Sequence, residues 1–182
     1  MNNFKTNSNR RQWLALTAAA CAALSFGAQA QSTWPTKPVT LIVPFPAGGG
    51  TDTFARPFSA QFSKQSGKTL VIDNRGGSGG LLGMKITADA AADGYTLLVN
   101  ADSAQVINPA LYAKTGFDPV KDFKPISLIG AVPNVLLVNP SFPAKSVGEL
   151  LAMAKAGKVD QYQYASAGNG TLNHLLGEML NS

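Results

Sequence analysis

Apolar and polar positions fall in alternating blocks that predict strands and helices in turn. Runs made almost wholly of apolar or β-branched residues lie at 39–43, 69–73 and 95–100, and such runs are typical of strands buried on both faces. Helices are expected at 53–66, where phenylalanines recur at a spacing of four, and at about 81–91. The order β-α-β-α-β predicts an α/β fold with a mainly parallel sheet.

The pattern is less regular after residue 100. Two proline-containing turn signals predict an irregular connection over residues 103–122. Apolar runs then predict two further strands, at 126–132 and 134–138, and a third strand is expected at 161–165. One helix is expected between a capping box that starts at Ser146 and the terminating Gly157, and another begins at about Leu172. These elements predict a second α/β unit.

Residues 1–30 have the pattern of an export signal. A basic pair, Arg10-Arg11, precedes an apolar stretch at 13–26, and Ala28-Gln29-Ala30 fits a small-x-small cleavage site. The apolar stretch is shorter than the roughly 20 residues of a membrane span, which favours a cleaved signal over an uncleaved anchor. We therefore expect an exported protein, and the choice between the general and the twin-arginine export routes stays open.

Composition narrows the chemistry of the remaining chain. The formal net charge is +5, but three of the 15 basic residues lie in the export signal, which leaves 12 basic and 10 acidic residues. No basic cluster follows residue 30, so a nucleic-acid partner is not expected. Cys21 is the sole cysteine and lies within the signal. Cleavage after Ala30 would exclude disulfides, thiol catalysis and cysteine metal sites.

A glycine-rich loop between the first strand and the first helix predicts an anion site. Residues 47–52 read Ala-Gly-Gly-Gly-Thr-Asp. The first N–H groups of a helix have no intrahelical acceptor and carry partial positive charge, and glycines let an anion approach them closely. The spacing fits neither a dinucleotide fingerprint nor a P-loop. A plain strand–helix turn, with Thr51 or Asp52 as the N-cap, is the competing interpretation.

Three other loops follow the same logic. Residues 166–171 precede the last predicted helix and offer Ser166 and Thr171 hydroxyls beside two glycines. Residues 76–80 and the strand end at 100–103 also fall beyond the carboxyl ends of predicted strands, where ligands bind in open parallel sheets.

Catalytic and metal-binding patterns are weak. The sequence has neither a G-x-S-x-G elbow nor an H-E-x-x-H motif, and His174 is its single histidine. We expect no catalytic residues, no metal and no cofactor. The alternative from another class is an exported α/β enzyme that acts on an anionic substrate, with His174 as its acid or base.

In combination, four motifs resemble one family. They are residues 43–52 (VPFPAGGGTD), 74–80 (NRGGSGG), 93–97 (DGYTL) and 164–174 (YASAGNGTLNH). These motifs are similar to those of the Bug, or TctC-like, solute receptors of tripartite tricarboxylate transporters. The resemblance implies a type II periplasmic-binding-protein fold with two α/β lobes, a small carboxylate ligand, membrane transporter subunits as partners, and location in the periplasm.

The resemblance also assigns candidate ligand-binding residues. Two facing loops would grip one carboxylate through backbone N–H groups and ordered waters, and the strand end after the third strand would line the cleft. The residues carried over are Ala47, Gly48, Gly49, Gly50, Thr51, Asp52, Asp102, Ser103, Ser166, Gly168, Asn169, Gly170 and Thr171. Gly76-Gly77 stands where the family commonly has Pro-Gly, a departure that affects loop stiffness.

Length is the main departure from the family pattern. Members run to about 300 mature residues, whereas 152 remain here after residue 30. We therefore expect a first lobe over residues 31–125 and a partial second lobe over 126–182, from a truncated product or partial sequence. Weak ligand binding, or a non-functional remnant with exposed strand edges, would follow from such a truncation.

Overall fold

A three-stranded parallel sheet in the order β2-β1-β3 positions the glycine-rich loops. Its strands are β1 (Val39–Val43), β2 (Leu70–Asn74) and β3 (Thr96–Leu98). The register pairs Val43 with Asn74 and Ile42 with Leu98, so all three strands end at the same edge. The three strands expected at 39–43, 69–73 and 95–100 are confirmed, with ends that differ by at most two residues.

The structure is a computed structural model, and it describes residues 34–157 and 161–182. The predicted export signal lies outside the described residues. Residues 37–182 form one compact unit. Within the two described ranges, no helix combines the length and the apolar character needed to cross a membrane.

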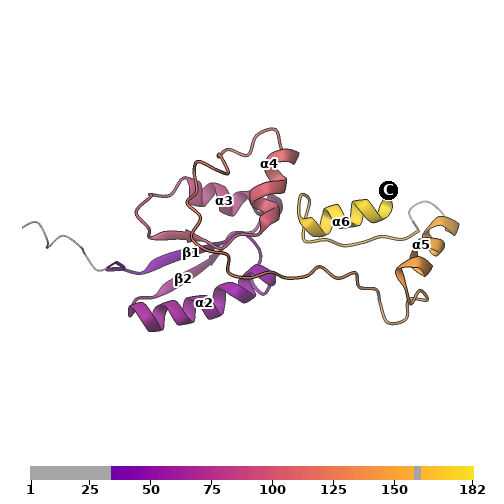
Figure 1. Cartoon of the computed structure of the whole chain (residues 1–182), viewed down its shortest axis with the longest axis horizontal. Helices are drawn as coiled ribbons and strands as arrows, with labels where there is room; N and C mark the ends of the chain where they lie inside the picture. The colour runs from indigo at the N-terminus through magenta and orange to yellow at the C-terminus, as the bar shows by residue number, and fades with distance from the viewer. Residues whose placement is uncertain (1–33, 158–160) are drawn as a thin grey trace, which may run out of the picture. The chain divides into compact units, whose positions relative to one another are not determined.

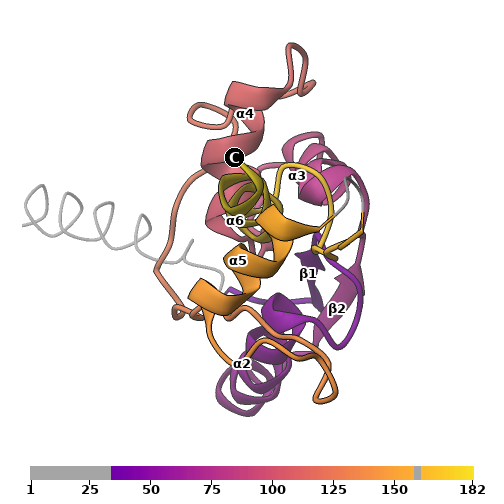
Figure 2. The ribbon, with the colours of Figure 1, turned by 90° about the vertical axis from the view of Figure 1, so that its right-hand side faces the viewer.

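Helices α2 (Gly50–Ser66) and α3 (Leu81–Ala88) cover opposite faces of the sheet (Figures 1 and 2). This arrangement explains why four of the five residues of β1 are apolar and buried. Its odd-numbered positions, Val39, Leu41 and Val43, cluster with Ala55 of α2. On the α3 side, Gly83 lies so close to Pro44 that a Cβ there would come within 2.6 Å of the proline Cβ.

Helix α2 begins earlier than the sequence predicted. Its first residue is Gly50 and its N-cap is Gly49, and the C-cap that follows Ser66 is Gly67 in the left-handed conformation. The expected N-cap role of Thr51 or Asp52 is therefore wrong, because both residues lie inside the first turn. Asp52 instead reaches back one turn to accept a hydrogen bond from the backbone N–H of Gly48.

One short helical turn lies before α3, and two others occupy part of the connection at 103–122 that was expected to be irregular. The 3₁₀ turn η2 precedes α3, and the π-helical turn η3 runs directly into α4. Their bounds are Ser78–Gly80 for η2, Ser103–Ile107 for η3 and Asn108–Leu111 for α4. Helices α5 (Val147–Ala156) and α6 (Leu172–Asn181) confirm the two later helices, with Ser146 and Thr171 as their N-caps.

The three strands predicted after residue 125 are not formed. Residues 126–138 and 162–165 carry neither helix nor strand in the structure. Leu128 and Leu137 are 87% and 81% exposed, so most of the surface of these two side chains is uncovered. A strand exists only where a neighbour accepts its backbone hydrogen bonds, and within the described residues these segments have no such neighbour.

Candidate functional site

The turn before α2 places a row of backbone N–H groups at the sheet edge. Gly49 donates from its N–H to the carbonyl of Pro46 over 3.3 Å, which closes the turn. Gly48 has a φ of +82°, a conformation that glycine adopts without strain. The N–H groups of Gly50, Thr51 and Asp52 belong to the first turn of α2, where a helix offers no intrahelical acceptor. Gly50 is exposed, and a Cβ at this position would meet nothing within 4 Å.

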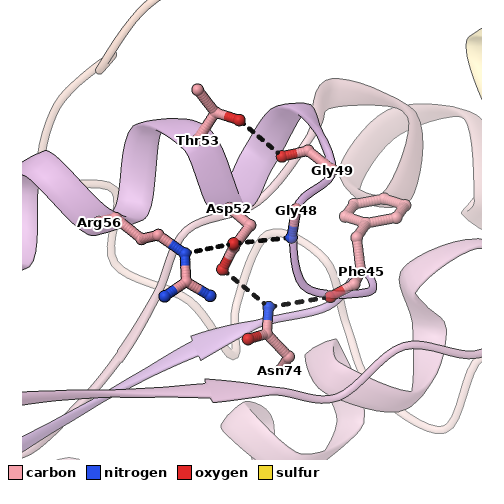
Figure 3. A network of polar contacts seen from close by, with 7 residues as sticks. All are labelled: Phe45, Gly48, Gly49, Asp52, Thr53, Arg56 and Asn74. Carbon is pink, nitrogen blue, oxygen red and sulfur yellow. Dashed lines mark hydrogen bonds and ion pairs between the residues drawn. The ribbon is translucent and has the colours of Figure 1, made fainter.

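Asp52 is the buried centre of a polar network beneath this turn (Figure 3). Its Oδ2 accepts from the Gly48 N–H over 2.8 Å and from Arg56 Nε over 2.7 Å. Its Oδ1 accepts from Asn74 Nδ2 over 3.1 Å, and the same Nδ2 also donates to the carbonyl of Phe45 over 3.1 Å. Asp52 therefore links β2, the turn and α2 through one side chain.

These hydrogen bonds favour the charged form of Asp52. The Gly48 N–H contributes most, followed by the Arg56 and Asn74 side chains, and together they hold the pKa of Asp52 below its ordinary value despite the burial of the residue. Asp52 is thus a carboxylate whose two oxygens are both engaged within the protein.

A second glycine-containing loop precedes α6. Thr171 is 2% exposed, and its Oγ1 accepts from the N–H of His174 over 3.4 Å while donating to the carbonyl of Gly168 over 2.6 Å. Ser166 is exposed and its Oγ accepts from the N–H of Gly168 over 3.3 Å. This loop has a φ of +122° at Gly168 and +80° at Gly170, so two of its residues use the left-handed region.

A pocket of about 390 Å³ lies where this second loop meets the turn before α3. Its lining residues come from three loops and α4's C-terminal end: Phe45, Pro46, Gly77, Ser78, Gly79, Gly80, Tyr112, Ala167, Gly168 and Asn169. Of the predicted ligand-binding residues, this set includes Gly168 and Asn169. Residues 47–52 follow directly on the lining residues Phe45 and Pro46 but are not among them.

Asp102 and Ser103 lie at the start of η3. Asp102 Oδ1 accepts from the N–H of Ser103 over 2.7 Å, and Ser103 is buried. Farther along, the fully buried Asn108 donates from Nδ2 to the carbonyl of Gly79 over 2.9 Å. A Cβ on Gly170 would overlap the Asn108 side chain. Asn108 therefore lies between the loop before α3 and the loop before α6.

His174 lies in the first turn of α6, as expected from the sequence. Its Nε2 is 3.7 Å from Glu178 Oε1. Tyr164 donates its hydroxyl to the same carboxylate, and this hydrogen bond is the main reason that the pKa of Tyr164 is raised. Among the residues that the structure describes, no group of three or more His, Cys, Asp or Glu side chains is arranged to hold a metal ion.

Two asparagines that were not predicted from the sequence organise the site: Asn74 is half-buried and Asn108 is fully buried. Asn74 and Asn108 each hold a loop through hydrogen bonds that span 29 positions of the chain. A polar residue at the end of an apolar strand was a usable signal for Asn74. No local signal marks Asn108, because its partner is a backbone carbonyl on a distant turn.

Comparison with known proteins identifies relatives of about twice the length. The family model described as "Tripartite tricarboxylate transporter family receptor" matches residues 54–182. The chain is 36% identical over 174 residues to the UPF0065 protein in the tcbD-tcbE intergenic region of Pseudomonas sp. (strain P51). That match covers 96% of this chain and 51% of the relative.

The chain is also similar to solved structures of proteins about twice its length. The chain is similar to R. palustris Rpa4515 with adipate (38% identity, TM-score 0.77), to MatC from Rhodopseudomonas palustris with bound malate (36%, 0.74) and to the periplasmic binding protein BugD (34%, 0.67). Each match covers 81% of this chain and 48% to 51% of the other protein. The expected α/β binding-protein fold is confirmed, and the chain spans about half the length of the proteins it matches.

Proposed function

The chain belongs to the tripartite tricarboxylate transporter receptor family, and on this premise we propose that it captures a small organic carboxylate in the periplasm. The ligand would be passed to membrane subunits of such a transporter. Relatives with bound adipate and malate support a carboxylate as the ligand class. The proposal is for a receptor, with no residue assigned a catalytic role.

The observation that carries this proposal is the turn at Gly48–Gly50. A carboxylate needs hydrogen-bond donors and positive potential, and the N-terminus of α2 supplies both without a charged side chain. Gly48 and Gly50 are exposed and leave room for the ligand to reach the backbone. The loop before α6 would supply the second set of donors, from Ser166, Gly168, Asn169, Gly170 and Thr171.

The pocket beside Phe45 and Pro46 is a suitable place for the body of the ligand. Its volume of about 390 Å³ lies in the range of small-molecule sites, which is roughly 300–1,000 Å³. Its lining combines the Phe45 and Tyr112 rings with backbone polar groups of the 77–80 turn. An aliphatic or aromatic chain between a bound carboxylate and these rings would match that character.

A neutral analogue tests the ligand class. Titration calorimetry of the purified chain should detect heat with adipate and none with adipamide, which has the same chain and amides in place of both carboxylates. Equal binding of the two compounds would contradict carboxylate recognition. No heat with adipate or with malate would contradict the proposed function for this chain.

A proline substitution tests the donors at α2. Gly50→Pro removes one N–H at the first helical position, where proline is well tolerated, and the extended backbone of Gly49 suits a following proline. Loss of a hydrogen bond to a charged group predicts roughly tenfold to hundredfold weaker adipate binding. Val147→Pro at the same position of α5 is the matched control, since it follows the extended Ser146, and should leave adipate binding unchanged.

A further inference from the structure

Asn74, on the neighbouring strand, stabilises the turn before α2 through side-chain hydrogen bonds. It is the last residue of β2 and pairs in register with Val43, the last residue of β1. Its single side-chain nitrogen reaches two acceptors, the Phe45 carbonyl and Asp52 Oδ1, each at 3.1 Å (Figure 3). One amide therefore joins the start of the turn to the first turn of the helix.

The turn is held at both of its ends. Phe45, at its start, is fixed by Asn74, and Gly48, near its end, donates to Asp52 over 2.8 Å. Asp52 connects these two anchors, because its oxygens accept from both sides. The intervening Pro46 carbonyl closes on the Gly49 N–H, so the chain between the anchors is also hydrogen-bonded.

We propose that Asn74 and Asp52 are positioning residues that hold the turn in its ligand-ready form before a carboxylate arrives. This inference rests on the proposed function and specifies how the α2 site is prepared. Neither side chain would touch the ligand. Both act through the backbone of residues 45–50, which leads into the first turn of α2 and would otherwise have to be ordered on binding, at a cost in affinity.

The contacts of Asp52 argue against direct ligand binding by its carboxylate. Its side chain is 1% exposed, and both oxygens already accept hydrogen bonds. A second carboxylate placed against it would be repelled. Arg56 supplies the compensating positive charge at 2.7 Å, and of the N–H groups in the turn the carboxylate engages that of Gly48.

Amide hydrogen exchange on the full chain tests the positioning role. Asn74→Ala removes both donations, and Asn74→Asp removes them without changing the size of the side chain. The control is Asp73→Asn on the same strand, which alters an exposed pair with Arg75 and leaves the network intact. In both Asn74 variants we expect exchange at Gly48 and Gly49 to rise about tenfold or more, while residues of β1 stay protected.

Adipate affinity and the pattern of exchange then distinguish positioning of the turn from general support of the fold. Adipate binding should weaken about tenfold in both Asn74 variants and stay unchanged in the Asp73 control. Unchanged exchange at Gly48 and Gly49 would overturn the proposal, and so would an equal rise along β1, β2 and the turn. If the wild-type chain binds neither adipate nor malate, the proposed function fails, and the exchange comparison still decides whether Asn74 orders the turn.

Discussion

Arg56 donates from Nε to the buried Oδ2 of Asp52 over 2.7 Å, one helical turn along α2. The Arg56 side chain is 59% exposed, whereas that of Asp52 is 1% exposed. The pair therefore combines a buried Asp52 carboxylate with an Arg56 side chain that remains accessible to water. An ion pair between two exposed side chains contributes little by itself, but here the carboxylate is buried and also accepts from Gly48 and Asn74.

Acid should weaken the fold through Asp52. Its folded-state pKa is lowered, mainly by the Gly48 N–H and then by Arg56, so its stabilising contribution is present above the ordinary value of 3.8. That contribution is lost as the pH falls through the lowered folded-state pKa. We expect Asp52→Asn to be less stable than the wild type at pH 7, and the difference to shrink as the pH falls below 3.8.

Chemical denaturation at a series of pH values measures this difference. Asp118, an exposed-loop carboxylate, also has a lowered pKa, chiefly because of the N–H groups of Lys121 and Val120. Its background contribution is present in both proteins and cancels in the comparison. A difference between the wild type and Asp52→Asn that stays constant from pH 7 down to pH 2 would contradict the linkage.

Two helical glycines should respond in opposite ways to alanine. A Cβ at Gly83 would lie 2.8 Å from the Pro44 Cα and 3.1 Å from the Arg75 carbonyl, both of them backbone atoms that cannot swing aside. Gly83→Ala should therefore push α3 from β1 and destabilise the protein by about 1–3 kcal/mol.

Gly148→Ala is the control in α5, because nothing lies within 4 Å of its added Cβ. It should be neutral or stabilising by up to about 1 kcal/mol, since alanine favours the helix. Thermal or denaturant unfolding distinguishes the two variants. Equal effects would show that close packing against Pro44 does not limit residue 83.

The N-cap of α6 should matter for stability and for ligand binding. Thr171→Ala removes the acceptor for the His174 N–H and the donor to the Gly168 carbonyl, at an expected cost of about 1 kcal/mol. Thr171→Ser should restore most of the loss. Ser146→Ala removes the equivalent cap from α5 and should lower stability similarly, without weakening adipate binding.

Substitution of His174 distinguishes the receptor proposal from the competing enzyme interpretation. As a residue whose Nε2 lies near Glu178 on the same helix, it can be replaced by alanine with a modest change in stability. Neither the wild type nor His174→Ala should hydrolyse esters or amides of adipate in a product assay. Turnover in the wild type that disappears in the variant would contradict the receptor proposal.

The elements that could be predicted from the sequence are those whose determining contacts are local. Ser146 accepts from the Glu149 N–H, and Gly157 ends α5, as a capping box and a following glycine predict. The central strand was equally clear, because an apolar run at 39–43 needs cover on both faces. Such features depend on residues within one or two turns of each other.

The rest depends on distant partners. Asn74 has its effect through Phe45, which is 29 positions away in the sequence, and no local pattern specifies that contact. The reverse error occurred at 126–138, where strand propensity was real but no neighbouring strand is available among the described residues. The start of α2 was predicted too late in the sequence. Gly49 and Gly50 resemble loop residues, whereas the helix includes Gly50.

The apolar segment at 126–138 should promote self-association of this chain. Leu128 and Leu137 are 87% and 81% exposed, and the backbone around them carries neither helix nor strand, so it is available to pair with another chain. Leu128→Lys and Leu137→Lys should reduce self-association in sedimentation velocity, since a charge opposes strand pairing between copies.

Each lysine variant should change the free energy of unfolding by no more than about 0.5 kcal/mol, because little of either side chain is buried. Leu41→Ala, at a position 1% exposed in the core, should instead cost about 2–5 kcal/mol. A comparably large loss of stability in either lysine variant would mean that this segment is packed in solution, in contradiction to its exposure in the structure.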